Sequence, residues 1–126
     1  MIHFDKDKVG TDLFEKYGIE KRFKVFRYAY RDNWEEAKAR FVVHFQLENM
    51  SAKANKRFSA IPMLFLIRFR GFMAKYWLCD ETTGECMGVY HWKTVEDAER
   101  YSKSIAMRFM TKRSVKESVW FEIVSL

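Results

Sequence analysis

Hydrophobic and polar residues are arranged so that five stretches of the chain favour β-strands. Each stretch combines β-branched and aromatic residues, and the first also alternates between apolar and polar positions. The stretches are 22–30 (RFKVFRYAY), 41–48 (FVVHFQLE), 72–79 (FMAKYWLC), 86–92 (CMGVYHW) and 118–125 (SVWFEIVS). The turn-rich hexapeptide 80–85 (DETTGE) separates the third stretch from the fourth, so we expect a β-hairpin there.

Apolar residues three or four positions apart predict helices between these strands. One helix is expected to begin after Ser51, which can cap its N-terminus, and to stop at Gly71. Pro62 should kink or restart this helix, because its ring removes a hydrogen bond and clashes one turn back. The run 63–69 (MLFLIRF) is apolar nearly all round, so a buried strand is its alternative interpretation.

A second helix is expected to begin after Thr94, with Asp97 completing a variant of the capping box, and to continue unbroken to Arg113. Its apolar positions are three or four apart, namely Ala98, Tyr101, Ile105 and Phe109. The first part of the chain is less regular. A short amphipathic helix over 9–17 would end at Gly18, and residues 32–38 favour a turn or short helix.

From residue 41 the predicted order is strand, helix, strand, strand, helix, strand. This order is that of a ferredoxin-like α+β fold, a βαββαβ unit in which two helices cover one face of an antiparallel sheet. We therefore expect residues 41–126 to form the domain and residues 1–40 to form an N-terminal extension. The uncovered sheet face would expose aromatic rings at a cost of about 25 cal/mol per Å², so a partner is expected to cover it.

The composition adds a surplus of large apolar side chains. The 126 residues include 12 Phe, 6 Tyr and 4 Trp, more than one small core usually takes. An oligomer interface or an apolar pocket would use them. The two cysteines, Cys79 and Cys86, would face each other across the hairpin, and in a reducing cytoplasm we expect two packed thiols rather than a disulfide.

Charge is distributed unevenly around a net value of +6. Residues 49–79 carry Lys and Arg and no acidic residue, whereas residues 80–99 are strongly acidic. A basic surface can attract nucleic acid or anionic lipid, although a solvated surface is the more common explanation. The chain shows neither a secretory signal nor an apolar run long enough for a membrane span, so a cytoplasmic location is expected.

The strands VVHFQL (42–47) and RGFMAKYW (70–77) and the segment GVYHWKTVEDAERYSKS (88–104) resemble the dimeric α/β barrel superfamily. The resemblance is to its branch of antibiotic-biosynthesis-monooxygenase-like domains and other small monooxygenase-like proteins. It implies a homodimer that closes a barrel through the open sheet faces, with a pocket in each subunit. Some members oxidise aromatic polyketides without metal or flavin, and others degrade haem. The resemblance therefore implies no cofactor, with haem or flavin left open.

In this picture His44 and His91 are the candidate catalytic residues, because a neutral imidazole can accept a proton near neutral pH. The plainer interpretation of each is a half-buried histidine with a structural role. We favour the arrangement in which Tyr90 and Trp92 face the helices and His91 faces the barrel cavity. The expected ligand-binding residues are Trp77, Trp120, Phe45 and Val89, with dimer packing as the alternative for the two tryptophans.

The sequence therefore favours a homodimer that binds a small apolar or aromatic molecule and that could act as a cofactor-independent monooxygenase. Sequence motifs for dinucleotide, P-loop, zincin and serine-hydrolase chemistry are missing, and no metal site is expected. A non-catalytic structural or regulatory dimer, or one that associates with a membrane surface through residues 63–69, is the alternative. Nucleic-acid binding is less favoured, because strand 86–92 lacks the RNA-binding sheet pattern.

Overall fold

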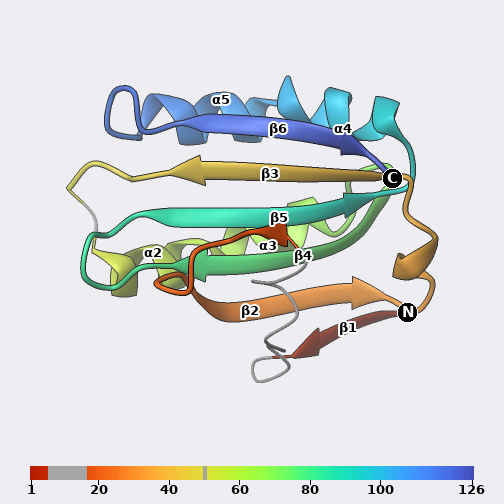
Figure 1. The fold of residues 1–126 in the computed structure, drawn as a ribbon, viewed down its shortest axis with the longest axis horizontal. Coiled ribbons are helices and arrows are strands. Elements are labelled where there is room, and N and C mark those ends of the chain that lie inside the picture. Colours follow the sequence, from red (N-terminus) through yellow and green to blue (C-terminus); the bar gives the residue numbers. More distant parts are fainter. Residues whose placement is uncertain (6–16, 50) are drawn as a thin grey trace.

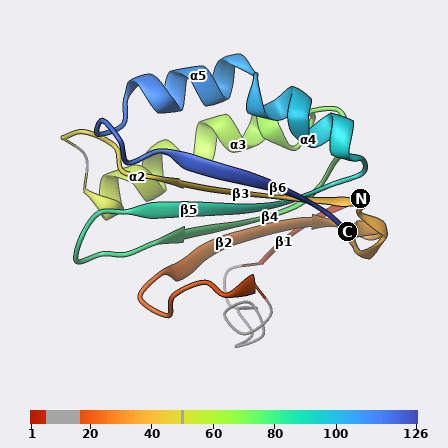
Figure 2. The same cartoon turned by 45° about the horizontal axis from the view of Figure 1, so that its top comes forward.

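The computed structural model of the chain describes residues 1–5, 17–49 and 51–126. They form one antiparallel sheet with the helices packed on one of its faces (Figures 1 and 2). In chain order the described elements are β1 (Ile2–Asp5), β2 (Lys24–Arg31), the 3-10 helix η1 (Trp34–Glu36), β3 (Ala39–Phe45), α2 (Ala52–Phe58), α3 (Ala60–Leu66), β4 (Phe72–Cys79), β5 (Cys86–Trp92), α4 (Val95–Ser102), α5 (Ile105–Lys112) and β6 (Trp120–Ser125). None of the described helices is long and apolar enough to cross a membrane.

The strand order confirms the expected ferredoxin-like fold. The six strands lie in the order β1-β2-β4-β5-β3-β6, and every neighbouring pair is antiparallel. Strands β4, β5, β3 and β6 with their helices are the βαββαβ unit predicted from residue 41 onward. Strands β1 and β2 extend the same sheet beyond β4, so the N-terminal part of the chain adds to the sheet edge (Figure 1).

The first helical region breaks as its proline predicts. Helix α2 ends at Phe58, and α3 begins at Ala60, which places Pro62 in the first turn of the new helix. A proline is tolerated there, because a first-turn N–H has no partner within the helix. The N-terminal cap is also as expected, since Ser51 Oγ accepts a hydrogen bond from Ala54 N.

The second helical region is divided, and the prediction of one unbroken helix from Thr94 to Arg113 is wrong. Ser104 adopts an extended conformation between α4 and α5, and its hydroxyl accepts a hydrogen bond from Met107 N. A serine that caps a new helix in this way competes with continuation of the old one. The break buries Met107 against the sheet and leaves Ile105, expected on the apolar stripe, 83% exposed.

The hairpin between β4 and β5 has the predicted register. Cys79 lies opposite Cys86, and Asp80 and Glu85 are joined by a backbone hydrogen bond of 2.8 Å. Gly84 occupies the left-handed region with φ of +80°, which suits glycine in a tight turn. The helix predicted over residues 9–17 falls almost entirely outside the described residues.

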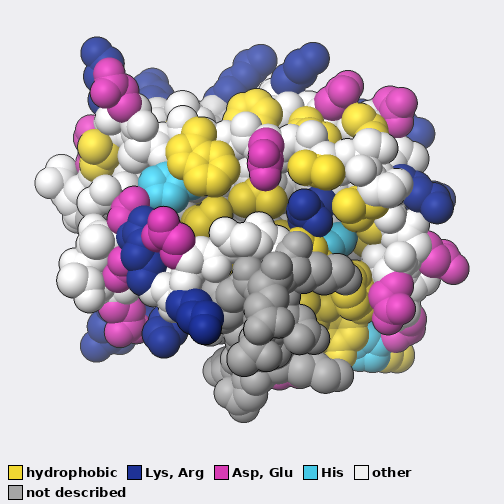
Figure 3. Space-filling view, viewed as in Figure 1, with side chains coloured by type: hydrophobic (Ala, Val, Ile, Leu, Met, Phe, Trp, Pro, Cys, Tyr) yellow, Lys and Arg dark blue, Asp and Glu magenta, His cyan; other side chains and the backbone are white. Residues whose placement is uncertain are grey.

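Apolar side chains pack on both faces of the sheet. The helix-side face holds the larger core, in which Phe41, Phe72 and Trp92 are fully buried. On the opposite face Ile19 and Phe23 pack against Val42 and Leu78. Residues 17–23 of the same chain thus cover part of the face for which we expected a partner. Hydrophobic side chains remain visible on this side over β3 and β6 (Figure 3).

Candidate functional site

A cavity of about 520 Å³ lies between α2, α3 and α5 and the helix-side face of the sheet. Its volume falls in the range of small-molecule sites, and its walls are mostly apolar and aromatic. The lining includes Phe26, Val43, Phe45, Met63, Leu66, Trp77, Tyr90, Tyr101, Met107 and Met110, with the polar side chains Asn55, Ser59, Lys75 and Arg113. No acidic side chain is among the described lining residues. The cavity is therefore suited to a largely apolar molecule.

Lys75 places an amine on the sheet wall of this cavity. It lies on β4 directly opposite Tyr90 on β5, and only 9% of the residue is exposed. Its Nζ is 4.4 Å from the ring centre of Trp77 and 4.3 Å from that of Tyr90. Neither a hydrogen bond nor an ion pair joins Lys75 to another residue that the structure describes. Two aromatic faces are thus its neighbours instead of a carboxylate.

Burial controls the charge of this amine. Desolvation lowers the pKa of Lys75 well below its usual value, and the positive charge of Arg27 lowers it further. The two rings act in the other direction, because a desolvated cation–π contact stabilises an ammonium by about 2 kcal/mol. Burying an unpaired ion costs several kcal/mol, so desolvation is the larger effect. Burial therefore favours the neutral form of this amine.

Because Gly88 has no side chain, Lys75 and Tyr90 can occupy the space beside it. It lies on β5 opposite Trp77, and a Cβ on Gly88 would be 2.7 Å from Tyr90 Cε1 and 3.2 Å from Lys75 Cε. The first distance is too short for any real side chain. The missing Cβ is thus what allows the lysine chain and the Tyr90 ring to lie side by side.

Two phenols close the α4 side of the cavity. The hydroxyls of Tyr90 and Tyr101 are 3.2 Å apart and form a buried hydrogen bond. Desolvation raises the pKa of both tyrosines, for Tyr90 well above its ordinary value. Both phenols therefore stay neutral, and their hydrogen bond satisfies polar atoms that would otherwise be costly to bury.

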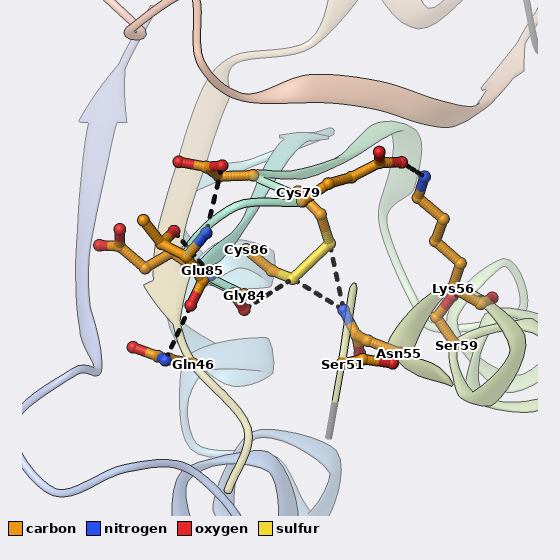
Figure 4. The surroundings of a disulfide bond; sticks show 12 residues. Gln46, Ser51, Asn55, Lys56, Ser59, Cys79, Gly84, Glu85 and Cys86 are labelled. Atoms are coloured by element: carbon orange, nitrogen blue, oxygen red, sulfur yellow. Dashed lines mark hydrogen bonds and ion pairs between the residues drawn. A yellow bond between two sulfur atoms is a disulfide. The ribbon is translucent and has the colours of Figure 1, made fainter. Parts of the chain in front are cut away.

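A disulfide between Cys79 and Cys86 lies at the hairpin end of the cavity (Figure 4). The two cysteines lie directly opposite each other, as expected, but their sulfurs are bonded, so the expectation of two packed thiols is wrong. Asn55, which is buried on α2, directs its amide Nδ2 at both sulfurs, 3.3 Å from Cys79 Sγ and 2.9 Å from Cys86 Sγ. The disulfide and Asn55 together tie α2 to the end of the hairpin.

The structure divides the residues predicted for the site between the two faces of the sheet. Trp77 and Phe45 line the helix-side cavity. Val89 packs in the core on the opposite face, and Trp120 lies there beside His44. Trp77 and Trp120 therefore do not form one stacking wall. Side chains alternate between the two faces along each strand, so the face that a residue reaches depends on its position in the strand and on the register of the sheet.

His44 lies in a polar recess on the opposite face. Its Nδ1 donates to the Ser118 carbonyl at 2.6 Å, and its Nε2 is 2.9 Å from a carboxylate oxygen of Glu85. Trp120 stacks flat on the imidazole, with ring centres 5.5 Å apart. Both ring nitrogens are engaged, and a catalytic role for His44 stays a prediction that these bonds do not favour.

Arg22 balances the acidic groups around this recess. Its guanidinium contacts Asp80 at 2.9 Å, Glu85 at 2.5 Å, and Glu20. Its hydrogen bonds hold the pKa of Glu85 down to about 2 and lower that of Asp80. This recess is thus a network of paired charges, in contrast to the cavity with its single amine.

His91 faces away from the helices, as predicted from the alternation of Tyr90, His91 and Trp92. It is 3% exposed beneath Tyr17, whose hydroxyl is 3.2 Å from His91 Nε2, and Trp34, whose ring meets it edge-on. Residues from the N-terminal part of the chain therefore cover His91. Its proposed catalytic role stays a prediction.

Sequence reasoning missed Lys75 and Asn55 as site residues. A signal for Lys75 existed, since it is the only charged residue within the apolar strand FMAKYWLC (72–79). A lone charge in a central strand predicts either a partner or a perturbed group. Asn55 carried no such signal in a polar helix start. Among the described residues, no three His, Cys, Asp or Glu side chains gather to hold a metal ion.

Comparison with known proteins places this geometry in a known fold. No family model matches the chain, and no curated protein does. A solved structure that is similar is an uncharacterised ferredoxin-fold protein related to antibiotic biosynthesis monooxygenases, from Listeria monocytogenes. It is 8% identical with a TM-score of 0.63, over 80% of this chain and 62% of that one. The chain thus spans less than two thirds of that protein.

Two further similar structures match more of their own length. A heme-degrading enzyme from Listeria monocytogenes is 9% identical with a TM-score of 0.59, over 98% of this chain and 96% of that one. An anthrone oxidase-like protein is 12% identical with a TM-score of 0.57, over 92% of this chain and 69% of that one. Identities this low show the fold alone. The chain therefore has the ferredoxin-like α+β fold found in proteins related to antibiotic biosynthesis monooxygenases.

Proposed function

We propose that this protein binds a small aromatic molecule in the cavity between its helices and its sheet. The observation that carries the proposal is the cavity itself, about 520 Å³ with mostly apolar walls and few polar side chains. Trp77 offers a ring against which a planar ligand can stack. The names of similar structures, which include an anthrone oxidase-like protein, support an aromatic ligand without identifying it.

Haem suits this cavity poorly. The described lining residues include no histidine, and Cys86 is held in the disulfide. Tyr90 and Tyr101 are neutral phenols that bond to each other, so neither is available as a phenolate ligand. We therefore derive no step through haem.

A binding titration with 2-naphthalenemethanol, followed by calorimetry, tests the proposal. Ala106 is an exposed residue of α5 that lines the cavity, and Ala106→Trp should fill its mouth and weaken binding about tenfold or more. Ala54→Trp is the matched control, because Ala54 is also exposed on a helix but does not line the cavity. Equal affinity in the two variants, or no binding by the native protein, would contradict the proposal.

Oxidation of the bound molecule by dioxygen, without a cofactor, is the reaction class that we propose. Such chemistry needs a dry pocket and a base that forms the substrate anion. The apolar walls and the buried amine of Lys75, whose pKa desolvation lowers, fit these two needs. Oxygen uptake with anthrone as substrate, lost in Ala106→Trp and retained in Ala54→Trp, is the expected result. Binding without oxygen uptake would leave a ligand-binding protein that is not an oxygenase.

We propose that the protein is a homodimer that packs through the uncovered part of the sheet near β3 and β6. Trp120 is 48% exposed there, and β6 is an edge strand of the sheet. Trp120→Asp should shift the native mass from dimer to monomer. Phe4→Asp, at an exposed aromatic on the other edge strand, should not. A native protein that is monomeric at micromolar concentration would contradict this proposal.

A membrane surface is the second candidate partner, because exposed apolar side chains gather on the helices around the cavity. They are Phe58, Leu64, Phe65, Ile105 and Phe109. The sequences of α2 and α5 contain basic residues, α3 contains no charged residue, and none of the three helices contains an acidic one. Co-sedimentation with phosphatidylglycerol vesicles, lost in Phe65→Asp and absent with phosphatidylcholine, is the expected result. Equal co-sedimentation by Phe65→Asp would contradict it.

A further inference from the structure

Lys75 is the one amine of the described structure that faces the cavity, and its surroundings differ from those of an ordinary structural lysine. A buried lysine with a structural role is usually paired with a carboxylate. The described walls of this cavity contain no acidic side chain. Among the charged or titratable groups, Arg27 from β2 acts on the amine through its charge, and the ring of Tyr90 from β5 contacts it. Tyr101 from α4 and Arg113 beside α5 line the same cavity.

The backbone and its neighbours hold this side chain in one place. The cross-strand pair with Tyr90 fixes the position of Lys75 on the sheet, and the missing Cβ of Gly88 leaves room for its carbon chain. The rings of Trp77 and Tyr90 both contact Nζ, with ring centres 4.4 and 4.3 Å away. An amine held in this way can present its nitrogen lone pair to the cavity.

Lysines become nucleophilic when they are desolvated in an apolar pocket or lie near another cation. Both conditions hold here, because apolar walls surround Lys75 and Arg27 is the charge that acts on it. A free amine reacts with an aldehyde or ketone, whereas an ammonium has no lone pair to do so. An aromatic carbonyl compound meets the demands of both the walls and the amine.

We infer that Lys75 is a nucleophile that captures an aromatic aldehyde or ketone in the cavity as a reversible imine. The Nζ lone pair attacks the carbonyl carbon, and the C=O π electrons move to oxygen, which takes a proton from the nitrogen. Loss of water from this carbinolamine gives the imine, and hydrolysis restores the amine and the carbonyl compound. No oxidant or reductant is consumed. This inference rests on the proposed function, because the same cavity must first bind the aromatic group.

Trapping with 2-naphthaldehyde and borohydride at pH 7 tests the inference. Borohydride reduces an imine to a stable secondary amine, so intact mass should rise by one naphthylmethyl group, and peptide mapping should place it on Lys75. Modification of Lys75 should exceed that of any exposed lysine by about tenfold or more, because exposed amines are protonated at this pH. Mapping of the native protein needs no variant and remains decisive if a variant fails to fold.

Two variants complete the design. Lys75→Met keeps a side chain of similar length and removes the amine, so this variant should lose the adduct. It should still bind 2-naphthalenemethanol, which has the same ring but no electrophilic carbon. Lys93→Met, at an exposed lysine, should leave the adduct unchanged. Binding of the alcohol without an adduct on Lys75, or equal modification of exposed lysines, would overturn the inference and spare the proposed function. Failure of the native protein to bind either compound would overturn both.

Discussion

The two faces of the sheet differ in how their buried or half-buried polar side chains are paired. On the opposite face, His44, Glu85, Asp80 and Arg22 are joined by hydrogen bonds and ion pairs, so each charge has a partner. On the helix side, Lys75 lies against two aromatic rings, and no described acidic side chain lines its cavity. The number of polar residues near a site is therefore a poor guide to its reactivity. A network of paired charges stabilises itself, whereas a single desolvated amine remains available for chemistry.

The largest expected difference between the two faces is in the cost of replacing a tryptophan, because Trp92 and Trp120 are buried to different extents. Trp92 is fully buried on the helix side, and Trp92→Ala should lower the free energy of unfolding by about 3–5 kcal/mol. Trp120 is 48% exposed on the opposite face, and Trp120→Ala should cost about 1 kcal/mol or less in a monomer. Urea denaturation measures both values. Equal losses would mean that the opposite face is as much a core as the helix side.

The disulfide joins the two strands of the β4–β5 hairpin, and Asn55 of α2 contacts both of its sulfurs. Cys79 and Cys86 are seven positions apart, and closing so short a loop stabilises a folded chain by about 2–3 kcal/mol on the chain-entropy account. Cys79→Ala combined with Cys86→Ala should lose that amount, and Asn55 should lose its two sulfur acceptors. Urea denaturation with and without a reducing agent provides the measurement. The double variant should be insensitive to the reductant, and a native protein equally insensitive would speak against the bond.

Gly88→Ala should disturb the cavity from the sheet side. The added Cβ would meet Tyr90 Cε1 at 2.7 Å, so Tyr90 and Lys75 must move. Overpacking of this kind costs about 1–3 kcal/mol. Binding of 2-naphthalenemethanol should weaken together with stability, while the contacts of His44 on the opposite face remain. If calorimetric affinity and unfolding free energy both match those of the native protein, Gly88 has no role in shaping the site.

The paired charges of the opposite face should make the stability of the protein depend on pH in the acidic range. Arg22 lowers the folded-state pKa of Glu85 from 4.5 to about 2 and lowers that of Asp80. A lowered pKa means that stability from these groups is present above pH 4.5 and is lost as pH falls toward 2. Arg22→Met should therefore reduce the melting temperature at pH 6 and have little effect near pH 2. Lys21→Met, at an exposed neighbour, is the control, and parallel acid profiles for Arg22→Met and the native protein would refute the pairing.

The redox state of the cysteines bears on where the protein works. Disulfides are rare in a reducing cytosol, so the Cys79–Cys86 bond and the expected cytoplasmic location point in different directions. The location stays a prediction, as does the division of the chain into an extension of residues 1–40 and a domain of residues 41–126. Expression of residues 41–126 alone would test the division of the chain. This fragment would lose β1, β2, η1 and the first two residues of β3, and with them the strands that extend the sheet beyond β4.

The βαββαβ order, the hairpin register and the break near Pro62 can be predicted from the sequence, because each depends on local periodicity, turn residues or backbone restriction. Alternation along the strand also predicts that His91 and Tyr90 point to opposite faces. Which of those faces holds the cavity, and hence that Trp77 and Trp120 lie apart, follows from the tertiary packing of the helices on the sheet. Tertiary packing also decides the role of Ser104. A serine can lie inside a continuous helix or cap a new one, and burial of Met107 favours the cap. Tyr17 covers His91, and residues distant in sequence desolvate Lys75. A local sequence pattern cannot predict such contacts, because it does not show which distant segments meet in the fold.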